Sequence, residues 1–232
     1  MSQFIVGLDL GQAQDYTAIC VLEIPLVMAA HSSDDPIQVR HLERVRGTPY
    51  PAVVARVSEI MAGLGEAATL VIDLTGVGRP VSDLFTQKGI RHYGISIHGG
   101  DQVTGEGMYF RVPKRDLVTA VLISLQRGKL KIAASLPDST TLVKELENFR
   151  VKIDPKTAHD SYSAWREQDH DDLVLAVALT VWYFLTVLYP HRRNFLNEPA
   201  SDDAVIDGSR EDDMKFFDDD FGIEELWGPG GL

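Results

Sequence analysis

Four aspartates stand beside apolar segments of this chain, where a carboxylate is costly to bury unless it binds a partner. Asp9 interrupts one apolar segment, Asp73 ends another, and Asp171 and Asp172 begin a third. Gathered in one place, their like charges would raise each other's pKa values until cations neutralised them. Carboxylate oxygens suit Mg²⁺ or Mn²⁺, and a pair of such ions can hydrolyse a phosphodiester. The four aspartates are therefore candidate metal ligands.

Each aspartate also has an ordinary structural interpretation. Asp73 precedes a turn that contains threonine and glycine, and it could cap that turn. An aspartate at the start of a helix, such as Asp171 or Asp172, is commonly its N-cap. Capping does not explain Asp9, which lies between two leucines within a predicted strand. The four aspartates taken together favour a common site over four separate caps.

The hydrophobic pattern predicts a fold that could gather these side chains. The expected strands are 3–10, 16–24, 37–45, 68–72, 91–97 and 129–133, with a possible hairpin of 150–153 and 161–165. The expected helices are 50–64, 76–87, 114–127, 139–149 and 171–188, the last of them apolar nearly all round and so buried. Three antiparallel strands followed by right-handed β-α-β crossovers give a mixed α/β sheet with helices on both faces. The first and fourth strands would then be neighbours.

Three segments that carry the aspartates resemble a known family. GLDLGQAQDYTA, LVIDLTGVGRPVSDLF and HDDLVLAVAL are similar to the three acidic motifs of the nuclease domain of the phage terminase large subunit. The resemblance extends from residue 4 to about residue 188. It implies a ribonuclease H-like mixed central sheet, three antiparallel strands and then parallel strands, flanked by helices.

The resemblance also implies an activity and a set of ligands. By this likeness the chain is a metal-dependent endonuclease that cleaves double-stranded DNA with two Mg²⁺ or Mn²⁺ ions. Asp9, Asp73 and one or both of Asp171 and Asp172 would hold the ions. Asp15 occupies the place of a further acid in the first motif and would assist as a ligand, although it could equally be a turn residue.

Two other classes share part of this pattern. A RuvC-like junction resolvase would have the same fold and metals but a branched DNA substrate. An actin-like or sugar-kinase-like ATPase also begins with a G-x-D-x-G hairpin, but it needs a second similar half and an adenosine-binding glycine pair. Such ATPases do not call for two aspartates at the head of the last helix, so the nuclease is the favoured interpretation.

The expected partners follow from the resemblance. They are DNA and a separate terminase ATPase, small terminase subunit or portal, in the cytoplasm of a bacterial host. The sequence contains no G-x-x-x-x-G-K-[ST] phosphate-binding motif, so we expect another polypeptide to drive DNA movement.

A nuclease needs cationic groups for the DNA backbone. The candidate DNA-binding residues are Arg79, Arg111, Lys114, Arg115, Arg127 and Lys129. A solvated surface explains these charges equally well. The polar segment 98–107 is expected to be a Gly-rich loop that could lie over the substrate. No helix-turn-helix or zinc-finger pattern is present, so little sequence preference is expected.

The charge of the chain is unevenly distributed. The net charge is -12, and residues 198–232 hold twelve acidic and only two basic side chains. We therefore expect a nuclease domain at 1–190 and an acidic, disordered tail at 191–232. The single cysteine, Cys20, excludes an intramolecular disulfide and a multi-cysteine zinc site. No signal peptide, membrane-spanning helix or membrane partner is expected.

Overall fold

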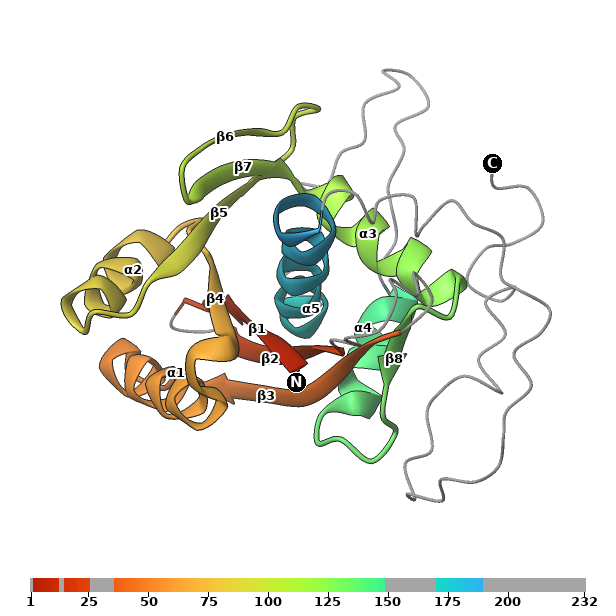
Figure 1. Cartoon of the computed structure of the whole chain (residues 1–232), viewed down its shortest axis with the longest axis horizontal. Helices are drawn as coiled ribbons and strands as arrows, with labels where there is room; N and C mark the ends of the chain where they lie inside the picture. The colour runs from red at the N-terminus through yellow and green to blue at the C-terminus, as the bar shows by residue number, and fades with distance from the viewer. Residues whose placement is uncertain (1, 13–14, 26–35, 149–169, 190–232) are drawn as a thin grey trace.

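An eight-stranded mixed sheet with helices on both faces forms the frame of the computed structural model (Figure 1), which describes residues 2–12, 15–25, 36–148 and 170–189. The strands are β1 (Ser2–Asp9), β2 (Tyr16–Pro25), β3 (Ile37–Arg46), β4 (Ala68–Asp73), β5 (His92–His98), β6 (Thr104–Glu106), β7 (Tyr109–Pro113) and β8 (Leu130–Ile132). The helices are α1 (Tyr50–Leu64), α2 (Gly78–Gln87), α3 (Lys114–Gln126), α4 (Ser139–Asn148) and α5 (Asp172–Tyr183). A short 3₁₀ turn, Gly65–Ala67, follows α1, and a π turn, Phe184–Leu188, follows α5.

The strands lie in the order β6-β7-β5-β4-β1-β2-β3-β8. β1, β2 and β3 are antiparallel neighbours, as successive apolar segments without an intervening helix favour. β4 pairs in parallel with β1, and β5 in parallel with β4, through the crossover helices α1 and α2. The predicted sequence of antiparallel and then parallel strands is therefore confirmed. β8 adds a parallel strand beside β3 at the far edge.

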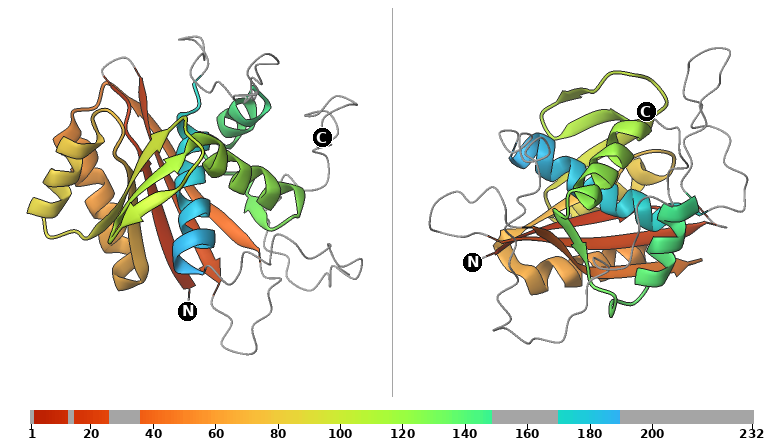
Figure 2. Two further views of the ribbon diagram at one scale, coloured as in Figure 1. Left: turned by 90° about the horizontal axis from the view of Figure 1, so that it is seen from above. Right: turned by 90° about the vertical axis from the view of Figure 1, so that its right-hand side faces the viewer.

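The sheet is curved, and α5 lies inside the curve (Figure 1). The views in Figure 2 place α1 and α2 on one side of the strands and α3 and α5 on the other. Side-chain alternation along β1 produces these two cores, because successive residues of a strand face opposite sides. Ile5 belongs to the core with α3, α4 and α5, whereas Val6 and Leu8 belong to the core with α1 and α2.

Helix α5 is buried along its whole length, as its apolar sequence predicts. It approaches β1 so closely that Gly7 has no room for a side chain. A Cβ atom added there would lie 2.7 Å from Cγ2 of Thr180 and nearer still to the carbonyl oxygen of Ala176. The expected helix 171–188 is confirmed over 172–183, and its last turn widens into the π turn.

One expectation was wrong in part. The segment 98–107, expected to be a loop, ends in strand β6, which pairs with β7 in an antiparallel hairpin at the edge of the sheet. β6 is three exposed residues long and has no apolar alternation, so nothing in its residue types indicates a strand. The expected hairpin of 150–153 and 161–165, and the acidic tail, lie outside the described residues. None of the helices in the described ranges is both long and apolar enough to cross a membrane.

Candidate active site

Asp9 and Asp73 end two parallel neighbouring strands, so the sheet places them side by side. Leu8 of β1 is in register with Ile72 of β4, and each aspartate follows directly. Both aspartates are only 7% exposed, and the charge of Asp73 raises the pKa of Asp9. The backbone N–H of Thr75 donates to Oδ1 of Asp73 at 2.7 Å. Asp73 therefore orders the turn, as its structural interpretation predicts, and also faces Asp9.

Asp171 and Asp172 reach the same place at the N-terminus of α5, where Asp171 is the N-cap residue and Asp172 the first residue of the helix. Gly7 of β1 lies against Ala176 of α5, and Tyr189, just beyond α5, bonds to Gln3 near the start of β1, so the two elements run in opposite directions and the N-terminus of α5 lies beside the end of β1 that carries Asp9. Asp172 is buried, and neither its side chain nor that of Asp171 caps the helix. N-capping, the ordinary interpretation of this pair, therefore does not account for either side chain.

The clustering of ionised aspartates is electrostatically unfavourable when no cation is bound, and their pKa values show it. The pKa of Asp9 is raised well above its ordinary value, first by burial and then by the charges of Asp73, Asp172 and Asp171. Burial also raises the pKa values of Asp73 and Asp172. Lys114 acts in the opposite direction on Asp9 and Asp73. The described site therefore has an excess of negative charge that positive groups would stabilise.

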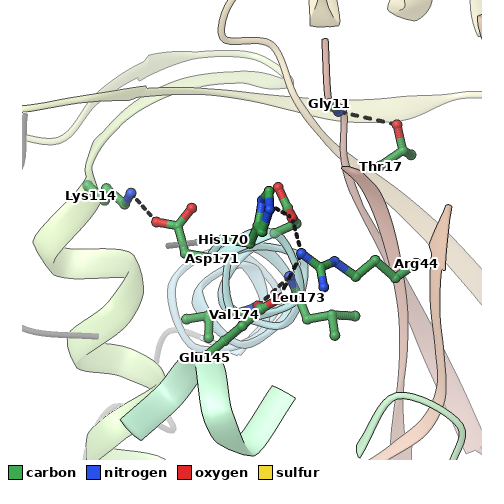
Figure 3. Close-up of polar contacts among 10 residues, drawn as sticks. Gly11, Thr17, Arg44, Lys114, Glu145, His170, Asp171, Leu173 and Val174 are labelled. Carbon is green, nitrogen blue, oxygen red and sulfur yellow. Dashed lines mark hydrogen bonds and ion pairs between the residues drawn. The ribbon is translucent and has the colours of Figure 1, made fainter. Parts of the chain in front are cut away.

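Two cationic side chains approach the head of α5 from opposite sides (Figure 3). The ammonium group of Lys114 donates to Oδ2 of Asp171. Nη2 of Arg44 lies 3.0 Å from Oδ2 of Asp172. Nδ1 of His170 lies 3.7 Å from the same oxygen. These contacts hold the two α5 carboxylates in place from outside the cluster.

Sequence reasoning missed two of the residues around the site, Arg44 and Glu145. Glu145, from α4, accepts the backbone N–H groups of Leu173 and Val174 at 2.9 and 3.2 Å, and so caps α5. Burial raises its pKa to about 7, although the two N–H groups and Arg44 oppose that rise. Arg44 pairs with residues far away in the chain, and its only local signal was a charge in a half-buried strand.

The four aspartates suit divalent cations by the chemistry of their atoms. All are carboxylate oxygens, the ligands that Mg²⁺ and Mn²⁺ prefer, and their crowding favours a positive occupant. Among the described residues no three carboxylate, imidazole or thiol groups converge as a finished ligand set. Asp171 and Asp172 are engaged by Lys114 and Arg44. Asp15 is exposed in the turn before β2, and its role as a ligand stays a prediction.

The candidate DNA-binding residues fall into two groups. Arg79 of α2 and Arg111 of β7 line an open cleft of about 940 Å³ between α2 and the β6–β7 hairpin. Leu74, the residue after Asp73, lines the same cleft from the side of the sheet that α2 covers, whereas the aspartates of α5 lie on the other side. Lys114 and Arg115 begin α3 at this end of the sheet, and Arg115 pairs with Asp101 at 2.8 Å.

Arg127 and Lys129 belong to the second group, at the opposite end of α3. A helix of this length separates them from Lys114 by about 20 Å. The carbonyl oxygen of Lys129 accepts the N–H of Ile37 at the start of β3, whereas Arg44 is near the end of that strand. The structure therefore does not bring these two residues to the acidic cluster, and their DNA-binding role stays a prediction.

The sheet order and the cluster at its strand ends define a ribonuclease H-like α/β domain. The chain belongs to the family described as the terminase RNaseH-like domain, which matches residues 6–181. It is 24% identical over 176 residues to the large subunit of the terminase of Thermus phage G20c. That match covers 76% of this chain and 30% of the relative, so the chain spans less than a third of that protein.

Solved structures of the same kind share the fold. The large terminase nuclease of the thermophilic phage G20c with bound magnesium has a TM-score of 0.56 and 22% identity, covering 78% of this chain and 80% of that one. The large terminase of a second thermophilic bacteriophage has a TM-score of 0.55 and 12% identity, covering 80% of this chain and 40% of that one. The expected fold class and the family resemblance are both confirmed.

Proposed function

We propose that this chain is a divalent-metal-dependent endonuclease that cleaves double-stranded DNA during phage or prophage DNA packaging. The observation that carries the proposal is the buried pair of Asp9 and Asp73 facing Asp171 and Asp172. Carboxylates are seldom buried together, because removing their charges from water is unfavourable unless they bind a partner. Groups with perturbed pKa values concentrate at functional sites. Family membership supports the same conclusion.

The four aspartates act as two pairs in the proposed site. Asp9 and Asp73 are mounted on adjacent strands and provide rigid oxygens on one side. Asp171 and Asp172 provide oxygens from α5 on the other side. Two Mg²⁺ or Mn²⁺ ions, when bound, would activate a water molecule and stabilise the leaving oxygen of a phosphodiester. Asp15 would assist from the turn after β1.

The cleft between α2 and the β6–β7 hairpin is the proposed path of the DNA backbone toward the strand ends that carry Asp9 and Asp73. Arg79 and Arg111 face it from α2 and β7, and cationic groups of this kind bind phosphate. Arg115 and Lys114 extend the positive charge toward the head of α3, where backbone N–H groups also favour phosphate. Phosphate contacts carry no sequence information, so we expect cleavage with little sequence preference.

The proposed partners are DNA and the other parts of a packaging machine, in the cytoplasm of a bacterial host. A separate terminase ATPase, a small terminase subunit or a portal would direct the nuclease to its substrate. The family of this chain supports these partners. Nothing in the geometry of the described residues favours a branched-DNA substrate of the RuvC kind, or an ATPase, over this proposal.

Incubation with supercoiled plasmid tests the proposed activity. With Mn²⁺ or Mg²⁺ the plasmid should become nicked and then linear, and EDTA should prevent both changes. Asp9→Asn and Asp73→Asn should abolish cleavage, because each removes a charged oxygen from the cluster. Glu66→Gln, the same type of change at an exposed position after α1, is the matched control and should cleave normally. Cleavage that persists in EDTA, or in both Asp variants, would contradict the proposal.

A further inference from the structure

Arg44 lies between two buried carboxylates that have different roles. Its Nη2 atom is 3.0 Å from Oδ2 of Asp172, a proposed metal ligand, and 3.7 Å from Oε1 of Glu145, the cap of α5. The side chain of Arg44 is 13% exposed, that of Asp172 12% and that of Glu145 6%. The guanidinium therefore has one close carboxylate and a second within about 1 Å of hydrogen-bonding distance.

Glu145 uses only half of its capacity to accept hydrogen bonds. Oε2 accepts the two N–H groups of α5, whereas Oε1 is buried without a hydrogen-bond partner among the described residues. Nε of Arg44 is likewise buried without a partner in that part of the chain. An unsatisfied donor and an unsatisfied acceptor thus lie on adjacent side chains. Leaving either one buried and unpaired is unfavourable, so a closer contact between them would stabilise the protein.

Tyr16 gives the guanidinium a surface along which it can turn. The Cζ atom of Arg44 lies 3.7 Å from the centroid of the Tyr16 ring, which is a cation–π contact. A planar guanidinium can turn over an aromatic face and keep that contact while its N–H groups change acceptors. The two carboxylates are therefore alternative partners for one stacked cation.

Arg44 would need a second partner whenever a metal ion binds Asp172. When ions take the oxygens of Asp172, Arg44 loses its close acceptor, and a buried cation without a partner is strongly destabilising. Glu145 is the negative group in reach, and it already has a free oxygen on that side. A shift of about 1 Å would restore a full ion pair without moving α4 or α5.

We propose that Arg44 is a positioning residue that pairs with Asp172 in the metal-free protein and transfers to Glu145 when divalent ions bind Asp172. This inference rests on the proposed function, since it requires Asp172 to be a metal ligand. Arg44 then competes with the metal, and Glu145 relieves the competition. Glu145 therefore sets the metal affinity although it touches neither the ions nor the DNA.

Titration of the protein with Mn²⁺ in a calorimeter, without DNA, tests this transfer. Glu145→Gln keeps an oxygen for the N–H groups of α5 but removes the charge that would receive Arg44. Arg44 should then remain on Asp172, and Mn²⁺ should bind about tenfold more weakly. Arg44→Gln removes the competitor, so Mn²⁺ should bind at least as tightly as to the wild type. The double variant should recover the affinity that Glu145→Gln loses.

The opposite signs of the two single variants separate transfer from a merely structural role. If Arg44 only held Asp172 in place, Arg44→Gln would weaken Mn²⁺ binding, and the losses of the two variants would add. Either result would overturn the inference, as would unchanged affinity in Glu145→Gln. Glu147→Gln, an exposed glutamate on the same helix, is the matched control and should bind as the wild type does.

Two further readouts keep the test decisive. If Glu145→Gln does not fold, Arg44→Gln decides alone, because weaker Mn²⁺ binding in that variant contradicts the competition. Wild-type protein that binds Mn²⁺ but cleaves no plasmid would refute the proposed function and leave the transfer standing. Wild-type protein that binds no divalent ion would overturn both.

Discussion

Replacing Gly7 with alanine tests how closely α5 must approach β1 for the site to form. Gly7 lies at the centre of the sheet, in register with Cys20 of β2 and Val71 of β4. The new Cβ would lie 2.7 Å from Cγ2 of Thr180, about 1 Å closer than carbon atoms normally pack. It would also meet the carbonyl oxygen of Ala176, which is fixed in the helix and cannot rotate away. Helix α5 must therefore retreat from the sheet by roughly 1 Å.

The size of the effect follows from that displacement. Overpacking of a filled core costs about 1–3 kcal/mol, and for a domain of this size each kcal/mol lowers the melting temperature by about 2–4 °C. We expect Gly7→Ala to melt about 2–12 °C below the wild type. Asp171 and Asp172 move with α5, and a misplacement of about 1 Å can reduce a catalytic rate about 100-fold. The loss of cleavage should therefore exceed what the loss of stability explains.

The assays are thermal melting without metal and plasmid cleavage with Mn²⁺ at a temperature where both proteins are folded. Gly63→Ala, near the end of α1, is the control, because a Cβ added there meets no atom within 4 Å. Alanine favours a helix over glycine by about 0.5–1 kcal/mol, so this variant should melt at the same or a slightly higher temperature. Gly7→Ala protein that melts and cleaves like Gly63→Ala would refute the close packing described for α5.

Three further predictions concern charge. The pKa of Asp9 is higher in the folded protein than in the unfolded chain, so the folded state binds the Asp9 proton more tightly. The contribution of this proton to folding stability is therefore complete at pH values below the ordinary pKa of aspartate, and it is lost as pH rises through the raised pKa of the folded protein. Asp9→Asn should therefore melt above the wild type at pH 8 in EDTA and level with it near pH 3, and a lower melting temperature at pH 8 would contradict the repulsion. Arg79→Gln and Arg111→Gln should each weaken duplex binding and reduce its salt dependence by about one phosphate contact, measured by fluorescence anisotropy in a salt series; an unchanged slope would remove the residue from the DNA path. Truncation after Asn197 should raise DNA affinity at low salt, with the gain fading as salt screens the acidic residues, and equal affinity at low salt would show that the tail does not compete with DNA.

The strand-borne half of the site could be predicted from the sequence because its signal is local. Asp9 and Asp73 each interrupt or end an apolar segment, and the right-handed crossover rule makes their strands parallel neighbours. The start of α5 could also be predicted from the sequence. A helix that is apolar all round must be buried, so the charged residues at its start must lie at the surface or in a polar site. Residue types and order were sufficient for these parts.

The supporting half could not be predicted, because it depends on contacts between distant elements. Arg44 pairs with an aspartate 128 residues away, and the register of β2 with β3 shifts at a bulge between Val21 and Leu22. Such a shift changes which side chains face α5, and it leaves no mark in the sequence. Glu145 looks like any glutamate on an amphipathic helix until α4 is docked against the head of α5.

The central position of α5 has a consequence for when the proposed active site can first form. The eight strands of the described sheet all precede α5 in the chain, and just beyond it the hydroxyl of Tyr189 donates to the side chain of Gln3, 186 residues earlier. Ribosomes add about 5–20 residues per second, so several seconds separate the synthesis of β4 from that of α5. During that interval Asp9 and Asp73 exist without their partners on the helix. The proposed site is therefore incomplete in a nascent chain, and it is assembled only when α5 packs against β1.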